Sequence, residues 1–166
     1  MPIPIPGKVN SAMNAYRSRP NTLPWPPILL VSILVCGIAL NSFTPLTLVF
    51  PGGRILGIVL IATALSIDLW AMATLRRAHT TIMPHRGSSH LVTEGPFKLS
   101  RNPIYLGNMM LLVGIGLFFQ IGWLLPLAVL DGVLTYYLAI RREEGHLIAM
   151  FGYKYESYMK AVRRWI

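Results

Sequence analysis

Long apolar blocks alternate with polar segments along this chain. The first block runs from Ile28 to about Phe50, and the second runs from about Arg54 to Leu75. Each is long enough for the ~20 residues with which a helix crosses the bilayer core. Pro51-Gly52-Gly53 predicts a tight turn between them, and the polar and proline residues at 41–45 indicate that the first helix bends or ends early. The pattern therefore predicts two membrane-spanning helices.

The next two apolar blocks predict a helical hairpin. Asn102-Pro103 is a strong helix start, because Asn is a preferred N-cap and Pro is preformed for the first turn. The apolar run from Ile104 to Phe119 is short for a full crossing, Gln120-Ile121-Gly122 turns the chain, and Trp123 to Ile140 leads back. We expect a hairpin here whether or not it reaches the far surface.

The segment after Glu144 has a different pattern. Its apolar residues recur every three or four positions, which is the period of one helix face. They are Leu147, Phe151, Tyr155, Tyr158, Val162 and Trp165. Charged residues lie elsewhere on the same helix, so we predict an amphipathic helix that rests on the membrane or covers a pocket. The predicted fold class is all-α: an integral membrane bundle of about four transmembrane helices, including the C-terminal hairpin, followed by this cytoplasmic amphipathic helix, in one domain over residues 1–166.

Composition and charge agree with a membrane protein. The chain is 54% hydrophobic and 13% charged, whereas soluble domains are roughly a quarter charged. Fourteen of the fifteen basic residues fall within 8–19, 76–101 and 141–164, and the remaining one is Arg54. The positive-inside rule makes those three segments cytoplasmic, and both termini with them. The net charge of +9 suits anionic lipid headgroups better than nucleic acid. We expect a multi-pass protein of a bacterial inner membrane with no nucleic-acid partner.

Two polar segments flank the first pair of apolar blocks. Residues 1–24 are rich in Pro, Ser and Asn and predict a loosely ordered cytoplasmic arm. Residues 76–102 form the longest polar segment, and long loops on a compact scaffold commonly carry function. Three of the four histidines lie in this loop, but their spacing matches no zinc motif and no cysteine accompanies them, so we expect no metal. The single Cys36 excludes an internal disulfide.

The helix start at Asn102-Pro103 is one candidate site. Its free N–H groups and partial positive charge suit a carboxylate or a phosphate. Gly95 and Gly107 allow close backbone approach, and Phe97 and Tyr105 offer aromatic faces. The alternative is an ordinary capped membrane helix.

Glu143 and Glu144 are the second candidate, because adjacent carboxylates are costly where an apolar helix leaves a bilayer. Neighbouring residues of a helix point about 100° apart, so one of the two is expected to face inward. A cationic ligand or a buried arginine would stabilise it; a pair of surface carboxylates bonded to arginines or headgroups is equally compatible with the sequence. Asp68 and Asp131, inside apolar runs, are candidates for a direct role. Alternatively, Asp68 pairs with hydroxyls of a neighbouring helix or with Arg76 or Arg77, two turns on.

Four sequence blocks together resemble the isoprenylcysteine carboxyl methyltransferase and phospholipid methyltransferase superfamily, in its bacterial form. The blocks are Leu91-Val92-Thr93-x-Gly95-Pro96-Phe97, Ser100-Arg101-Asn102-Pro103-x-Tyr105-x-Gly107, Glu143-Glu144-x-x-Leu147 and Phe151-Gly152-x-x-Tyr155-x-x-Tyr158. The resemblance covers residues 79–165, which would be the cofactor-binding catalytic core, and it includes the Thr80-Thr81-x-x-Pro84 stretch of bacterial members. Each block alone is weak, but four in this order around a helical hairpin are specific.

The resemblance implies an enzyme that uses S-adenosylmethionine. Carried onto matching positions, the family's cofactor contacts are Ser89, His90, Leu91, Val92, Gly95 and Phe97 in the loop, Asn102, Pro103, Ile104 and Tyr105 at the hairpin start, and Glu143 with Glu144 beside it. The residues agree with this cofactor: the glutamates complement its ammonium, the helix start can receive its carboxylate, and Tyr105 or Phe97 can flank its sulfonium.

The resemblance leaves the methyl acceptor open. Eukaryotic carboxyl methyltransferases usually have His where this chain has Asn102, so prenylcysteine specificity is not implied. The family's substrate-facing arginine has no direct match; Ala139 falls near its place, and Arg141 and Arg142 are the nearest candidates. We expect a lipid-like or amphiphilic acceptor with a carboxylate, amine or thiol. The catalytic candidates are Glu144, Arg142 and Tyr105, and a base, if the acceptor needs one, would come from Glu144, His90 or His146.

Two other functions remain compatible with the sequence. Membrane sterol reductases are similar in this C-terminal region and bind a nicotinamide cofactor there, so an enzyme that uses NADPH is one. A non-enzymatic membrane scaffold or small transporter is the other, and it would tolerate changes at Asn102 and Glu143.

Overall fold

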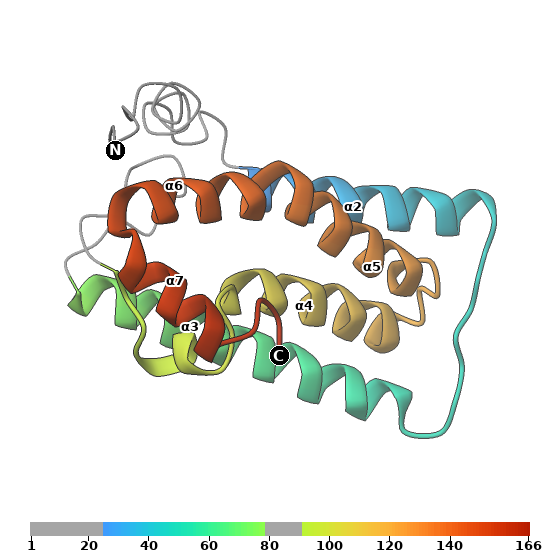
Figure 1. Ribbon diagram of the computed structural model, residues 1–166. Helices are drawn as coiled ribbons and strands as arrows, with labels where there is room; N and C mark the ends of the chain where they lie inside the picture. The colour runs from blue at the N-terminus through green and yellow to red at the C-terminus, as the bar shows by residue number, and fades with distance from the viewer. Residues whose placement is uncertain (1–24, 79–90) are drawn as a thin grey trace, which may run out of the picture.

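A computed structural model describes residues 25–78 and 91–166 (Figure 1). Within these ranges the fold is all-helical, as predicted; only Thr47 and Ile121 form an isolated β-bridge. The helices are α2 (Trp25–Phe43), α3 (Gly53–Arg77), η1 (Gly95–Lys98), α4 (Pro103–Phe119), α5 (Leu124–Thr135), η2 (Tyr136–Ile140), α6 (Arg141–Phe151) and α7 (Tyr153–Ala161).

Three helices are long and apolar enough to cross a membrane in the described part of the chain. They are α2, α3 and the continuous helix Leu124–Phe151, in which the π-helical turn η2 joins α5 to α6. The fourth apolar helix, α4, has 17 residues and is shorter than a usual crossing. The predicted hairpin is therefore confirmed, with one short arm and one long arm.

The first helix ends at Phe43, earlier than the apolar block does. Asn41 accepts a hydrogen bond from the amide of Leu46 through its Oδ1 atom (3.2 Å), and the hydroxyl of Thr44 donates to the carbonyl of Leu40 (3.0 Å). These local bonds satisfy backbone groups at the helix end. Residues 44–50 then lead to the turn at Gly52, whose φ of +80° is a left-handed conformation that favours glycine.

Glycines bring α3 and α4 into close contact. A Cβ atom on Gly57 would lie 2.7 Å from the backbone nitrogen of Phe118 and 2.8 Å from the carbonyl oxygen of Gly114. Close packing of this kind is how membrane helices gain dispersion energy without a hydrophobic driving force. The core on the other side of α4 joins Leu112 to Leu124 and Ala128 of α5 and to Ile33 of α2.

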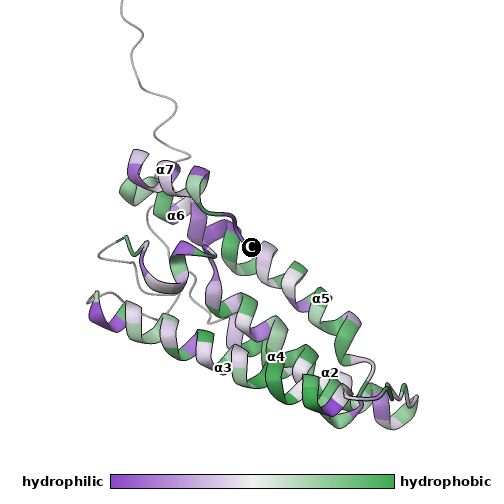
Figure 2. Ribbon diagram, turned by 90° about the horizontal axis from the view of Figure 1, so that it is seen from below, coloured by the Kyte–Doolittle hydropathy of each residue, from purple (hydrophilic) through white to green (hydrophobic). Residues whose placement is uncertain are grey.

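The polar residues gather at one end of the bundle. Figure 2 shows mostly hydrophobic residues along α4 and hydrophilic residues among those of α6 and α7. The single amphipathic helix predicted after Glu144 is broken into two, because Gly152 has φ +51° and ψ −128°. As a result α6 continues the long helix, while α7 turns back toward α3 and α4 (Figure 1). Beyond Ala161 the helix ends, and Val162 adopts an extended conformation.

Candidate functional site

The loop before α4 is fixed by contacts with α3 and α7. Gly95 has φ +60°, and a Cβ atom there would lie 2.7 Å from Oγ1 of Thr74 and 3.3 Å from Nε1 of Trp70. A glycine is therefore needed for η1 to lie against α3. On the other side, the hydroxyl of Tyr158 donates a 2.6 Å hydrogen bond to the carbonyl oxygen of Phe97.

The start of α4 binds the segment Val162–Ile166 that follows α7. The hydroxyl of Ser100 (3.2 Å) and Nδ2 of Asn102 (3.1 Å) both donate to the carbonyl oxygen of Arg164, and the amide of Arg101 donates to the carbonyl oxygen of Arg163 (3.0 Å). Asn102 precedes the first helical residue, Pro103, as predicted. Its side chain forms no capping hydrogen bond, however; its Nδ2 atom donates to this segment instead.

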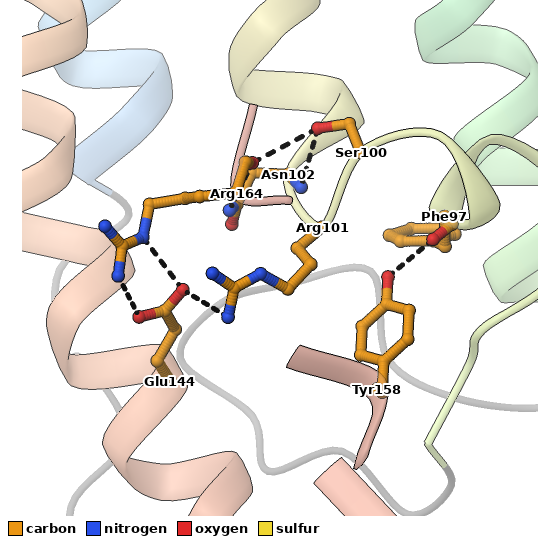
Figure 3. Close-up of polar contacts among 7 residues, drawn as sticks. All are labelled: Phe97, Ser100, Arg101, Asn102, Glu144, Tyr158 and Arg164. Carbon is orange, nitrogen blue, oxygen red and sulfur yellow. Dashed lines mark hydrogen bonds and ion pairs between the residues drawn. The ribbon is translucent and has the colours of Figure 1, made fainter. Parts of the chain in front are cut away.

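Glu144 is buried and bonded to two arginines (Figure 3). Nε and Nη2 of Arg164 donate to its two carboxylate oxygens at 3.0 and 2.9 Å, and Nη1 of Arg101 lies 3.1 Å from Oε1. The guanidinium of Arg164 also lies over the ring of Tyr136, 4.9 Å from its centroid. An inward-facing carboxylate was expected to have a cationic ligand or a buried arginine as its partner; Glu144 has a buried arginine, Arg101.

Glu143 points to a different neighbour. Its Oε1 atom accepts a 2.6 Å hydrogen bond from the hydroxyl of Tyr105, across the hairpin from α6 to α4. Among the residues that the structure describes, Glu143 forms no ion pair. The two adjacent glutamates thus differ in their partners, since Glu144 forms ion pairs with two arginines whereas Glu143 accepts a hydrogen bond from a tyrosine.

Two tyrosines of α7 line the group formed by Arg101, Arg164 and Glu144, which we call the arginine cluster. Tyr155 and Tyr158 are 2% and 9% exposed, and their ring centroids lie 5.9 Å apart. Burial raises the pKa of Tyr155 to about 12; the charge of Glu144 adds to this rise and Arg101 opposes it. Burial likewise raises the pKa of Tyr158. Both hydroxyls therefore stay protonated near neutral pH; that of Tyr158 donates to Phe97, and that of Tyr155 is hydrogen-bonded to Arg101.

The arginines of the cluster were not among the site residues expected from the sequence. Arg101 stands inside the second block of the resemblance, and its place beside Asn102 was the one available signal. For Arg164 the sequence held no signal, because its contact with Glu144 depends on the break at Gly152.

The other predicted residues fall into three groups. Tyr105 and Glu143 meet directly, and Asn102 and Glu144 are linked through Arg164. Leu91, Val92, Gly95, Phe97 and Ile104 are half-buried around the start of α4, Pro103 is buried, and Arg142 is exposed on α6. Ser89 and His90 lie outside the described residues, as do the N-terminal arm 1–24 and the Thr80-Thr81-x-x-Pro84 stretch.

The intramembrane acids lie apart from the arginine cluster. Oδ1 of Asp68 lies against Gly107 of α4, at the place that a Cβ atom would occupy. Asp131 is 2% exposed on α5. No described residue hydrogen-bonds to Oδ1 of either side chain. Within residues 25–78 and 91–166, no group of three or more His, Cys, Asp or Glu side chains could hold a metal.

Comparison with known proteins gives one match. A family model described as phospholipid methyltransferase matches residues 53–154, which is more than half of the chain. The match begins at the first residue of α3 and ends in the first turn of α7, so it includes the hairpin and both glutamates. None of the curated proteins and none of the solved structures compared matches this chain.

Proposed function

This chain belongs to the phospholipid methyltransferase family, and from that premise we propose that it transfers a methyl group from S-adenosylmethionine to a lipid-like or amphiphilic acceptor. The family supports a methyltransferase in a membrane, and the three long apolar helices agree with it. The donor and the class of acceptor are our assignment. The observation that carries it is the uncompensated carboxylate of Glu143, held by Tyr105 at the start of the short arm of the hairpin.

The charges of the site fit an amino-acid group. Glu143 has a carboxyl group without an ion-pair partner among the described residues, and it is positioned to accept hydrogen bonds from an ammonium, which would favour its charged form. Phe97 and Tyr105 supply aromatic faces near the start of α4 that suit a sulfonium. We therefore assign Glu143 to the ammonium of the donor, with Leu91, Val92, Gly95, Asn102, Pro103 and Ile104 forming the surrounding pocket.

Methyl transfer needs alignment more than a reactive side chain. The bound donor supplies an activated methyl group on its sulfonium. The protein has to hold the acceptor atom in line with that methyl and to exclude water. Tyr105, fixed by its bond to Glu143, is the residue that we assign to orientation. Glu144 is a positioning residue in this assignment, because both its oxygens are already used. Arg142, exposed on α6, is assigned to an anionic group of the acceptor.

The test is a titration of the purified protein in lipid nanodiscs with S-adenosylhomocysteine, the neutral product of the donor. We expect Glu143→Gln to weaken binding about 10–100-fold, because a hydrogen bond to a charged group contributes about 1.5–3 kcal/mol. Glu156→Gln, on the exposed face of α7, is the matched control and should bind like the wild type.

Three results would contradict the proposal. Equal affinities of Glu143→Gln and the wild type would remove the assignment of Glu143. Binding of NADPH by a wild type that does not bind S-adenosylhomocysteine would select a reductase, and binding of neither would favour a scaffold or transporter.

A further inference from the structure

His146 of α6 is a titratable residue that the mechanism above does not use. Both its ring nitrogens are fully buried, and neither has a hydrogen-bond partner among the described residues. A neutral imidazole has one N–H donor and one nitrogen lone pair that accepts. Because buried polar groups are nearly always bonded in folded proteins, the two nitrogens of His146 are available to a ligand that reaches this part of α6.

His146 lies next to the two residues of α6 that the proposed function assigns to the substrates. Residues three and four apart on an α-helix are neighbours on its surface. Glu143, three residues before His146, is assigned to the ammonium of the donor, and Arg142, four residues before it, is assigned to an anionic group of the acceptor. Arg142 is exposed and Glu143 is half-buried, so His146 stands at the edge of the site, within reach of both substrates.

The other acidic and basic side chains around this edge are bonded to protein groups. Glu144, which the sequence made a candidate base, has both carboxylate oxygens bonded to Arg164. Oε1 of Glu143 accepts the hydrogen bond from Tyr105. Imidazole is the general base that enzymes use most often. Of the bases expected from the sequence that the structure describes, His146 is therefore the one whose proton-accepting atom is open.

We propose that His146 is the general base of the transfer, and that the acceptor is a group whose reacting atom carries a proton, an ammonium or a thiol, and not a carboxylate. The proposal rests on the function proposed above. A carboxylate already presents a free electron pair and needs no base, whereas an ammonium or a thiol has to lose a proton before it can attack.

The step balances with His146 as the proton acceptor. One ring nitrogen of His146 takes the proton from the acceptor, and the electron pair left on the acceptor's nitrogen or sulfur forms the bond to the methyl carbon. The bond between that carbon and the sulfonium sulfur breaks, and its electron pair stays on the sulfur, which becomes a neutral thioether. The imidazolium of His146 then passes its proton to water.

The experiment measures single-turnover transfer of labelled methyl from S-adenosylmethionine in nanodiscs that contain the total lipid extract of the protein's own cells. His146→Gln should slow the transfer about 100-fold or more and change the affinity for S-adenosylhomocysteine less than about threefold, because general-base catalysis contributes about 10²–10⁴-fold to the rate and nothing to donor binding. Met150→Gln, one turn further along α6 and 49% exposed, is the matched control and should change neither quantity. In His146→Ala, added imidazole should restore the transfer at least about tenfold.

The labelled product reports the class of the acceptor. A methyl group on nitrogen or sulfur remains bound in mild alkali, whereas a methyl ester is hydrolysed and releases volatile methanol. We expect the label to be stable to alkali, and its release as methanol would overturn the proposal.

The other outcomes separate this proposal from the proposed function. A His146→Gln variant that transfers methyl as fast as the wild type overturns the assignment of the base. A loss of donor affinity as large as the loss of rate does so too, because His146 then only maintains the site, and so does a His146→Ala variant that imidazole does not restore. If His146→Gln does not fold, the restoration of His146→Ala is still required. A wild type that transfers no label, or that does not bind S-adenosylhomocysteine, refutes the proposed function itself.

Discussion

The contacts of Glu144 predict a large loss of stability for Glu144→Gln. The substitution keeps the shape of the side chain and removes the charge on which Arg101 and Arg164 converge. Arg164 is 32% exposed and can turn its guanidinium toward solvent, whereas Arg101 is 8% exposed and cannot. The variant therefore leaves Arg101 as a buried charge with no compensating carboxylate.

The size of the effect follows from that difference in burial. Removing one partner of a buried ion pair costs about 3–5 kcal/mol. The carbonyl oxygen of Gln can still accept one hydrogen bond from Arg164, so we place the loss at the lower end, about 3 kcal/mol. For a chain of this length each kcal/mol lowers Tm by about 2–4 °C, so the expected decrease is about 6–12 °C.

Thermal unfolding in detergent measures this decrease. Glu156→Gln removes an exposed carboxylate of α7 and should leave Tm unchanged. The double variant Glu144→Gln with Arg101→Met removes both charges, and its loss should be smaller than the sum of the two single losses because no charge is left stranded. A Glu144→Gln variant as stable as the wild type would show that the two arginines do not depend on this carboxylate.

Three further changes test the packing of the helices and of the loop before α4. Gly57→Ala requires α3 and α4 to separate by roughly 0.7 Å, from 2.7 Å to an ordinary contact of 3.4 Å with backbone atoms; the overpacking cost of about 1–3 kcal/mol should exceed the ~1 kcal/mol gained from helix propensity, and Tm should fall. Gly37→Ala meets the side chains of Leu124 and Leu127 and no backbone atom among its nearest contacts, so it should cost less; the reverse order would contradict the assigned contacts. Tyr158→Phe leaves the carbonyl of Phe97 without its donor and should cost about 1 kcal/mol, with faster tryptic cleavage at Lys98; unchanged cleavage would show that this bond does not hold the loop.

Much of the fold was predictable because a bilayer imposes simple rules on sequence. The length of each apolar block and the Pro and Gly residues between them were enough to place α3 and the hairpin. The early end of α2 depends on one side chain, Asn41, bonding the amide of Leu46. The composition of residues 41–45 indicated such an end, but not which residue would be the last.

The break at Gly152 could not be read from periodicity. Apolar residues continue every three or four positions on both sides of it, from Leu147 to Tyr158, so the pattern is that of one helix. Only the positive φ of Gly152 ends α6 and redirects α7. The burial of Tyr155 and Tyr158 follows from that turn, because it brings the apolar face of α7 against the loop before α4.

The two adjacent glutamates contact different parts of the structure. Their side chains lie about 100° apart on the helix, so Glu143 reaches Tyr105 of α4 while Glu144 reaches the segment that carries Arg164. The π-helical turn η2 lies directly before α6 and changes the register by which the long helix presents them. One carboxylate thereby holds the two arginines, and the other accepts a hydrogen bond from Tyr105. A substitution at Glu144 should therefore act first on stability and a substitution at Glu143 first on affinity, although the two residues are neighbours in the sequence.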